Sequence, residues 1–316
     1  MTRHPVAAER RLEALRHALG PAVLAALESD AVVEILANPD GRLVLDHQGI
    51  GREDTGVILA AEARDRAIRL IADHIGEPVT EGQPRLAGVL PTGERFQGML
   101  PPVAAAPTFS IRKRPARIWS LDDYVGQGVM TRAQAQALQT AAEGRMNILV
   151  SGGTGSGKTT LANAILADPA YARDRVFLIE DTPELQVSAW DQVAVMTRRS
   201  PPIGIADLVR DALRMRPDRI VVGELRDGAA VLETLKSWNT GHPGGMSTVH
   251  ANTAHDVPRR LLDLLGEVVA TPGARFIEQA VDRIVHIART PTGRRVQGVF
   301  AVRNGAGSTL ALEALT

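Results

Sequence analysis

Residues 151–160 read SGGTGSGKTT and lie between an apolar run, NILV at 147–150, and a helical pattern, LANAILA at 161–167. A strand, the sequence G-x-x-x-x-G-K-[ST] and a helix together place backbone N–H groups around the phosphates of a nucleotide. Glycine permits backbone angles and a close approach of phosphate that a Cβ atom would block. A flexible turn that contains a lysine is the simpler alternative, but the complete motif stands in the context that confirms it. We therefore predict a site for a nucleoside triphosphate.

Each residue of this stretch has an expected role. The amine of Lys158 would reach the β- and γ-phosphates, and the hydroxyl of Thr159 would ligate Mg²⁺. The expected cofactors are therefore ATP and Mg²⁺. Gly152 opens the motif, and the predicted nucleotide-binding residues that follow it are Gly153, Thr154, Gly155, Ser156, Gly157, Lys158, Thr159 and Thr160.

The composition excludes several classes of protein. Acidic and basic residues number 36 each, so no net charge draws the chain to nucleic acid or to an anionic membrane. The chain has no cysteine, which excludes disulfides, a thiol nucleophile and cysteine-ligated zinc. The charged N-terminal segment lacks the apolar region of a signal peptide, and no uncharged apolar run reaches the roughly 18 residues of a membrane span. These features predict a soluble, cytoplasmic protein.

The sequence patterns predict two domains, in keeping with typical domain lengths of about 100–200 residues. Residues 1–112 combine helical patterns with strand patterns, including two that flank the turn NPDG at 38–41, and predict a smaller α+β domain. Residues 113–130 show no sustained period and predict a linker. From 131 to 316, strands alternate with helices, which predicts an α/β domain with a doubly wound, mainly parallel sheet.

Polar residues that end apolar strands are the next candidates, because ligands of an open α/β sheet bind beyond the carboxyl ends of its strands. The run VFLIE ends in Glu180, MSTVH ends in His250, and RIVV is followed by Gly223 and Glu224. Many P-loop enzymes carry an aspartate at the position of Gly223, so this acidic motif is atypical. Asp181 and Glu184 lie in the loop that follows Glu180.

Phosphoryl transfer to water requires a group that orients the water, ligands for Mg²⁺ and positive charge at the γ-phosphate. We predict that Glu224 positions or activates the water and supports Mg²⁺ through a water molecule, with Glu180 as a second acidic contributor. For both, the alternative is a carboxylate on a solvated loop or at a helix cap. His250 is predicted to hydrogen-bond the γ-phosphate, because the glycines around it in TGHPGGMSTVHANT favour a site. A metal site of His242, His250 and His255 has weak support, since their spacing fits no zinc motif.

Four segments in order resemble the Walker A, Asp box, Walker B and His box motifs of the type II/type IV secretion ATPase superfamily: SGGTGSGKTT, LIEDTPE, RPDRIVVGELRD and TGHPGGMSTVHANT. The resemblance spans roughly residues 85–300, and EILANPDGRLVLD resembles the conjugal-transfer branch. It implies a RecA-like P-loop ATPase domain, a homo-hexameric ring, and peripheral association with the inner membrane through components of a type IV secretion channel. The chain lacks the four-cysteine zinc insertion and the long N-terminal extension of type II secretion and pilus-assembly ATPases, which favours the conjugation type.

The resemblance also implies that arginines of the first domain reach the nucleotide at the domain interface. The matching candidates are Arg95 in GERFQ and Arg112 in SIRKR. Either would add positive charge at the γ-phosphate in the transition state. The alternative for each is an arginine on the solvated face of a strand.

Three other functions remain open. The first is a pilus-assembly or pilus-retraction motor of the same superfamily, and the second is a DNA-translocating ATPase, because RKRPAR at 112–117 is locally basic. The third is a nucleotide-gated scaffold that hardly hydrolyses ATP. Balanced charge and only ten aromatic residues offer little for stacking on bases, so no direct sequence-specific nucleic-acid binding is expected.

Overall fold

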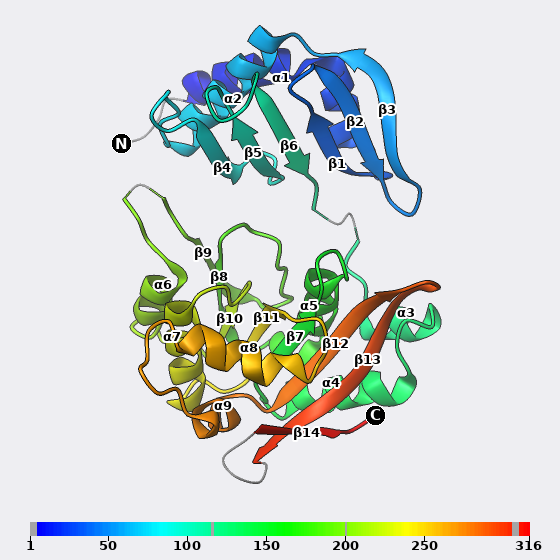
Figure 1. Cartoon of the computed structure of the whole chain (residues 1–316), viewed down its shortest axis with the longest axis vertical. Helices are drawn as coiled ribbons and strands as arrows, with labels where there is room; N and C mark the ends of the chain where they lie inside the picture. Colours follow the sequence, from blue (N-terminus) through cyan, green and yellow to red (C-terminus); the bar gives the residue numbers. More distant parts are fainter. Residues whose placement is uncertain (1–4, 115–116, 200, 305–309) are drawn as a thin grey trace. The chain divides into compact units, whose positions relative to one another are not determined.

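The structure is a computed structural model that describes residues 5–114, 117–199, 201–304 and 310–316. The chain divides into two compact units, Met1–Ala116 and Arg117–Thr316, and each unit has its own sheet and its own core (Figure 1). Among the described residues, no helix is both long enough and apolar enough to cross a membrane.

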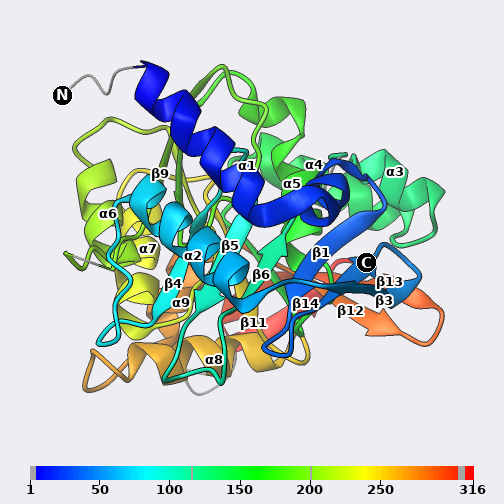
Figure 2. The same ribbon diagram turned by 90° about the horizontal axis from the view of Figure 1, so that it is seen from above.

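Six antiparallel strands form the sheet of the first unit, in the spatial order β3-β2-β1-β6-β5-β4. Two helices, α1 (Pro5–Glu28) and α2 (Ala61–Ile75), lie side by side on one face of this sheet (Figure 2). The predicted turn NPDG joins the first two strands. The strands are β1 (Val32–Ala37), β2 (Arg42–His47), β3 (Gly51–Ile58), β4 (Arg85–Val89), β5 (Arg95–Met99) and β6 (Thr108–Arg112).

The core of the first unit fixes which side chains point away from the helices. Ile35, Phe96 and Ile111 are fully buried between the sheet and the helices. Successive side chains of a strand point to opposite faces, so their neighbours along β1, β5 and β6 lie on the other face of the sheet. Arg95 and Arg112 are among these neighbours.

The second unit contains an eight-stranded sheet in the order β14-β13-β12-β7-β11-β10-β8-β9. The six strands from β12 to β9 in this order are parallel, and β13 and β14 extend the sheet with antiparallel pairs. The predicted α/β class with a mainly parallel sheet is therefore confirmed. The strands are β7 (Ile148–Gly152), β8 (Arg175–Glu180), β9 (Asp191–Met196), β10 (Arg219–Val222), β11 (Met246–His250), β12 (Arg283–Thr290), β13 (Gly293–Asn304) and β14 (Leu310–Ala314).

Helices cover both faces of this sheet, because its central strands are apolar on both sides. Ile148 and Val150 of β7 pack in one core, and Leu149 between them packs in the other. The first core includes residues of α3 (Leu121–Gly126), α4 (Arg132–Glu143), α5 (Lys158–Leu166) and the 3₁₀ helix η1 (Pro169–Tyr171). The second includes residues of α6 (Ile205–Ala212), α7 (Gly228–Asn239), α8 (Asp256–Leu265) and α9 (Ala274–Ala280).

The boundary between the units differs from the predicted linker at 113–130. Residues 117–130 belong to the second unit, and Leu121, Tyr124 and Met130 are buried in its core. The side chain of Ser120 caps α3 by accepting the backbone N–H of Asp123. A single helix of six residues gives too short a pattern to reveal a period, which is why the segment resembles a linker in the sequence. Residues 115–116 of the predicted linker lie outside the described residues.

Polar side chains tie together the amino ends of the parallel strands. Asn147, just before β7, accepts the backbone N–H groups of Gly244 and Gly245 and donates to the carbonyl of Ala280. Arg219, at the start of β10, is almost fully buried and donates to Asp174 and to the carbonyl of Ala142, near the end of α4. These contacts hold the loops at one end of the sheet, and they leave the carboxyl ends of the strands for the candidate site.

Candidate active site

The phosphate-binding loop predicted from SGGTGSGKTT connects β7 to α5, as the motif requires. Gly155 and Gly157 adopt left-handed backbone angles, with φ of 69° and 98°, which favour glycine. A Cβ atom on Gly152 would lie 2.3 Å from the carbonyl oxygen of Ile287, so only glycine fits against β12. The glycines of the motif therefore stand where the backbone angles and the packing against β12 require glycine.

Lys158 is the first residue of α5 and turns back over this loop. Its Nζ atom donates to the carbonyl oxygens of Gly152 and Gly153, at 2.9 Å each. Burial lowers the pKa of Lys158, the nearby Glu224 carboxylate raises it, and the nearby Arg226 guanidinium lowers it. The amine thus stands beside the loop and in electrostatic contact with the end of β10.

Hydroxyl and amide groups surround the start of α5. Thr159 and Thr160 follow Lys158 in the first turn and are partly exposed. The first N–H groups of a helix have no partner within the helix, so they are available to anionic ligands. Among the described residues, the buried hydroxyl of Ser156 has no hydrogen-bond partner. The predicted binding residues from Gly153 to Thr160 are therefore brought together in one loop and helix start.

Glu180 ends β8, and its side chain is buried rather than solvated. Its Oε1 atom accepts the backbone N–H groups of Glu184 and Leu185, at 2.9 Å each, and so closes the loop that follows the strand. A Cβ atom on Gly223 would lie 3.1 Å from Cγ of Glu180. This close packing gives a physical reason for glycine where many P-loop enzymes carry an aspartate. A direct role of Glu180 in the chemistry stays a prediction.

Glu224 follows β10 and is held by an arginine that the sequence analysis did not select. Arg226 contacts Oε2 of Glu224 through Nε at 2.7 Å and through Nη2 at 2.6 Å. Its Nη1 atom lies 3.2 Å from Oδ2 of Asp181, beyond the end of β8. Burial lowers the pKa of Arg226, but Glu224 and the other nearby carboxylates raise it more. Arg226 therefore joins the ends of two strands through ion pairs.

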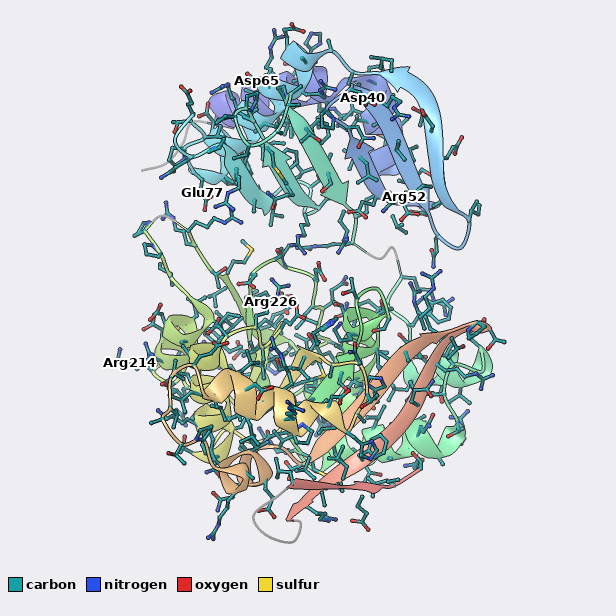
Figure 3. The ribbon with its side chains drawn as sticks, viewed as in Figure 1. Asp40, Arg52, Asp65, Glu77, Arg214 and Arg226 are labelled. Carbon is teal, nitrogen blue, oxygen red and sulfur yellow. The ribbon has the colours of Figure 1, made fainter. Side chains whose placement is uncertain are left out.

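The position of Arg226 could have been noticed in the sequence, because it stands two residues after Glu224 in GELRD. Figure 3 shows Arg226 in the middle of the second unit, whereas Arg214 lies at its outer edge. Arg226 is half exposed, and Arg214 is 84% exposed. The two arginines therefore provide a natural comparison between a site residue and a surface residue.

His250 is the last residue of β11, and its side chain is exposed. It is the direct partner of Gly152 in the pairing of β11 with β7, so it lies beside the start of the phosphate-binding loop. The glycines that precede β11 have another explanation than the one we expected. A Cβ atom on Gly245 would lie 2.0 Å from the indole nitrogen of Trp238, and one on Gly244 would lie 2.7 Å from Arg219. These two glycines serve packing at the opposite end of the strand.

The three histidines considered as metal ligands lie on different elements. His242 precedes β11, His250 ends it, and His255 packs edge-on against Phe300 with ring centroids 5.6 Å apart. In the described ranges of the chain, no group of three His, Asp or Glu side chains is placed to hold a metal ion.

A fourth histidine, His286, lies directly behind the phosphate-binding loop. It is on β12, is 3% exposed, and its Nδ1 atom lies 2.9 Å from the hydroxyl of Ser151. Burial lowers its pKa. The sequence analysis missed His286, because no local motif marks a residue 135 positions away from its partner.

Arg95 and Arg112 are direct cross-strand partners on β5 and β6 of the first unit. Glu34 of β1 is the next residue in the same row, and its Oε1 atom lies 3.4 Å from Nη2 of Arg112. Cross-strand partners share one face of a sheet, so the two arginines and Glu34 lie together on the face opposite α1 and α2. The structure thus brings the two predicted arginines together within their own unit.

Comparison with known proteins assigns this arrangement to a family. Residues 85–305 match the family described as "Type II/IV secretion system protein". The chain belongs to this family. It is 46% identical to a protein named "Probable conjugal transfer protein TrbB" from Sinorhizobium fredii, over 96% of this chain and 93% of that protein. It is also 46% identical to "Conjugal transfer protein TrbB" of Rhizobium radiobacter, over 93% of this chain and 90% of that protein. The predicted resemblance to the conjugal-transfer branch is confirmed.

Solved structures share the fold of the chain at lower identity. The pilus retraction motor PilT with bound ADP superposes with a TM-score of 0.63 and 19% identity, covering 92% of this chain and 82% of PilT. The ATPase DotB of Legionella pneumophila superposes with a TM-score of 0.54 and 20% identity, covering 99% and 81%. These two likenesses agree with the α/β architecture.

Proposed function

We propose that the chain is a Mg²⁺-dependent ATPase of the RecA-like P-loop type that powers a conjugal-transfer apparatus. The observation that carries this proposal is the phosphate-binding loop from Gly152 to Thr159, with Lys158 folded over it and Glu224 in electrostatic contact. Relatives with 46% identity are named as conjugal transfer proteins, and they are matched over nearly their whole length. Together these findings support ATP hydrolysis coupled to pilus biogenesis and substrate transfer.

The oxygen donors at the site fit Mg²⁺, which takes oxygen ligands and retains several waters. The hydroxyl of Thr159 stands in the first turn of α5, and the carboxylate of Glu224 lies near Lys158. Thr159 would hold the ion directly, and Glu224 would hold it through water. When bound, Mg²⁺ would neutralise charge on the β- and γ-phosphates.

The side chains of the site would divide the remaining work of hydrolysis. Lys158 would bind the β- and γ-phosphates, and Glu224 would orient the attacking water. His250 would contact the γ-phosphate from the end of β11, next to Gly152. Glu180 would support the loop between β8 and β9, since it holds two of its backbone N–H groups.

The paired arginines of the first unit would supply additional positive charge. Arg95 and Arg112 are direct cross-strand partners, so two positive charges lie on the same face of the sheet, which favours binding of an anion there. Glu34 occupies one side of this pair, at Arg112. We propose that Arg95 and Arg112 bind the γ-phosphate of the nucleotide, in a homo-hexamer whose ring formation responds to ATP.

The same proposal places the ring in the cytoplasm, at inner-membrane components of a secretion channel. The locally basic segment 112–117 does not add support for DNA binding. Lys113 donates to the carbonyl oxygens of Ala26 and Ser29, near the end of α1. Arg117 pairs with Asp123 and stacks over Trp119. These contacts within the chain give Lys113 and Arg117 a structural role.

Phosphate release from ATP by the purified full chain, with and without Mg²⁺, tests the proposed function. Wild-type protein should release phosphate only with Mg²⁺, and Lys158→Ala should release almost none because it loses charge aimed at the transferred group. Native mass spectrometry with a nonhydrolysable ATP analogue should show six-membered rings. No turnover by wild-type protein, or equal turnover by Lys158→Ala, would refute the proposal.

A further inference from the structure

The β8–β9 connection, residues 181–190, is described in full by the structure and contains no helix. The two strands are parallel neighbours at one edge of the sheet (Figure 1), and parallel neighbours are usually joined by a helix, which bonds its own backbone. Leu185 and Ala189 of the connection are buried in the core that also contains residues of α5. Buried backbone groups need partners, so side chains outside the connection must supply them here.

Asn163 of α5 supplies two of these partners. Its Nδ2 atom donates to the carbonyl oxygen of Glu184 at 3.0 Å, and its Oδ1 atom accepts the backbone N–H of Gln186 at 2.9 Å. A carbonyl oxygen requires a donor and an N–H requires an acceptor, so the two contacts fix the orientation of the amide. Asn163 is 2% exposed, and asparagine forms helices less readily than the alanines on either side of it. The two bonds account for an asparagine at this position.

Glu180 holds the same connection from the end of β8. Its Oε1 atom accepts the backbone N–H groups of Glu184 and Leu185, at 2.9 Å each. Three successive N–H groups and one carbonyl of the connection are thus bonded to two side chains, one on α5 and one on β8. One short backbone segment therefore joins α5 to the end of β8.

The start of the connection contacts the arginine that holds Glu224. Asp181 follows Glu180 directly, and its Oδ2 atom lies 3.2 Å from Nη1 of Arg226. Its other carboxylate oxygen accepts the hydroxyl of Thr197, just after β9. Arg226 contacts Glu224 through Nε and Nη2. A series of contacts therefore runs from α5 through the connection to Glu224.

We propose that Asn163 is a positioning residue that holds the β8–β9 connection against α5 and thereby sets the position of Glu224 relative to the bound phosphates. The inference rests on the proposed function, because it takes the start of α5 as the place where phosphates bind. Lys158 and Asn163 belong to the same helix of nine residues, so the connection is bonded to the element that carries the phosphate-binding lysine. In this role Asn163 acts through the connection and makes no contact with the nucleotide.

Asn163→Ala removes both bonds and introduces a residue that favours a helix. The matched control is Asn147→Ala, because Asn147 is also buried and bonds to two backbone segments, at the opposite end of the sheet. Both variants should lower the unfolding temperature, since each leaves buried backbone groups without a partner. Asn163→Ala alone should lower kcat, by about tenfold, with a less than about threefold change in KM for ATP. Unchanged kcat in Asn163→Ala, or an equal decrease in both variants, would overturn the inference.

Hydrogen exchange measures whether the effect of Asn163→Ala lies in the connection. Exchange of residues 181–190 should be faster in Asn163→Ala than in the wild-type protein, because the N–H of Gln186 loses its acceptor. Asn147→Ala should leave exchange in this segment unchanged. Equal exchange of residues 181–190 in Asn163→Ala and wild-type protein would contradict the proposed role.

A double-mutant cycle with Arg226→Gln tests the route to Glu224. Asn163→Ala should add little to the loss of kcat in Arg226→Gln, because both changes disturb the same series of contacts. If Asn163→Ala does not fold, Asp181→Ala tests the same route at a side chain that is 37% exposed, and it should lower kcat by about tenfold. Additive losses in the cycle, or unchanged kcat in Asp181→Ala, would show that the connection does not position Glu224.

Binding of a fluorescent ATP analogue distinguishes this inference from the proposed function. Wild-type protein and Asn163→Ala should bind the analogue with similar affinity, since the residues that contact phosphate are retained. Binding by both proteins together with equal kcat would refute the role of Asn163 alone. Absence of binding by the wild-type protein would refute the proposed nucleotide site itself.

Discussion

Arg226 holds one carboxylate oxygen of Glu224 with two nitrogens, Nε at 2.7 Å and Nη2 at 2.6 Å. Both side chains are at least partly exposed, so the pair adds little to stability, typically less than about 1 kcal/mol. Its effect should lie in the orientation of Glu224 instead. Arg226→Gln should lower kcat by about tenfold through loss of this orientation and should leave the unfolding temperature almost unchanged. Phosphate release and thermal unfolding measure the two effects.

The control for Arg226 is Arg214→Gln, which removes an equally charged group from the surface near α6. This variant should retain the kcat of the wild-type protein. A similar loss of kcat in both variants would mean that net charge is responsible, and the assigned role of Arg226 would be wrong.

Glu224→Gln should separate binding from chemistry. The amide keeps the size of the side chain but loses the basicity needed to activate water, so hydrolysis should fall by about 10²–10⁴-fold while ATP binding remains near normal. Titration with a fluorescent ATP analogue and phosphate release measure these two properties. Glu233→Gln on α7, which loses ion pairs with Arg210 and Lys236, is the control. Equal losses of binding and turnover in Glu224→Gln would indicate a structural role.

Arg95→Ala and Arg112→Ala should each reduce turnover strongly, because an arginine supplied from outside a P-loop can contribute roughly 10³–10⁵ in rate. Arg66→Ala, an exposed arginine on α2, should have no effect. The measurement is phosphate release by assembled rings, with ring formation followed by native mass spectrometry. Wild-type rates in both variants would mean that residues of the second unit supply all the positive charge needed for hydrolysis.

Acid should destabilise the protein through His286. Burial holds its pKa below the ordinary value of 6.5, so above pH 6.5 the ring is neutral in both the folded and the unfolded chain. As the pH falls below 6.5 the unfolded chain binds a proton first, and the free energy of unfolding decreases until the folded-state pKa is passed, by at most about 1.4 kcal/mol per pH unit. Urea unfolding of wild-type protein and His286→Gln between pH 7.5 and 5 measures this difference. Parallel pH profiles for the two proteins would contradict it.

Loss of Arg219 should destabilise the second unit severely. Its guanidinium is buried, donates to Asp174 and to the carbonyls of Ala142 and Ala170, and lies 4.3 Å from the ring centroid of Tyr171. Arg219→Met removes these contacts and leaves Asp174, among the described residues, with only its longer ion pair to Arg145, at 3.5 Å, which should cost about 3–5 kcal/mol of unfolding free energy. Urea unfolding measures the loss. Arg259→Met, at an 88% exposed position, is the control and should lose less than about 0.5 kcal/mol.

Local sequence signals were enough to predict the phosphate-binding loop, because strand, glycines, lysine and helix are contiguous. The positions of Glu224, just beyond β10, and of His250, at the end of β11, also follow from the apolar strand patterns, and their roles stay predictions. His286 could not be predicted, since its contact with Ser151 depends on the pairing of β7 with β12 across 135 residues. The glycines before β11 were assigned to the wrong cause, because only the packed structure reveals Trp238 and Arg219 against them.

Edge strands were also hard to predict from sequence. β9 and β14 have six and five residues and lie at the two edges of the sheet, where partial exposure weakens the apolar pattern. The start of the second domain was predicted too late, at 131 instead of 117, for a similar reason, since the short α3 has too few residues to show its period.

Asn147 and Arg219 secure the amino ends of the parallel strands, whereas Gly152, Glu224 and His250 gather at their carboxyl ends. A saturation mutagenesis map of the second unit should therefore show two separate bands. Substitutions in the first band should reduce the amount of soluble protein in the cell, and those in the second should give normal amounts of inactive protein. In the proposed ring, inactive subunits that still fold can assemble with wild-type subunits, so only the second band should contain dominant-negative alleles.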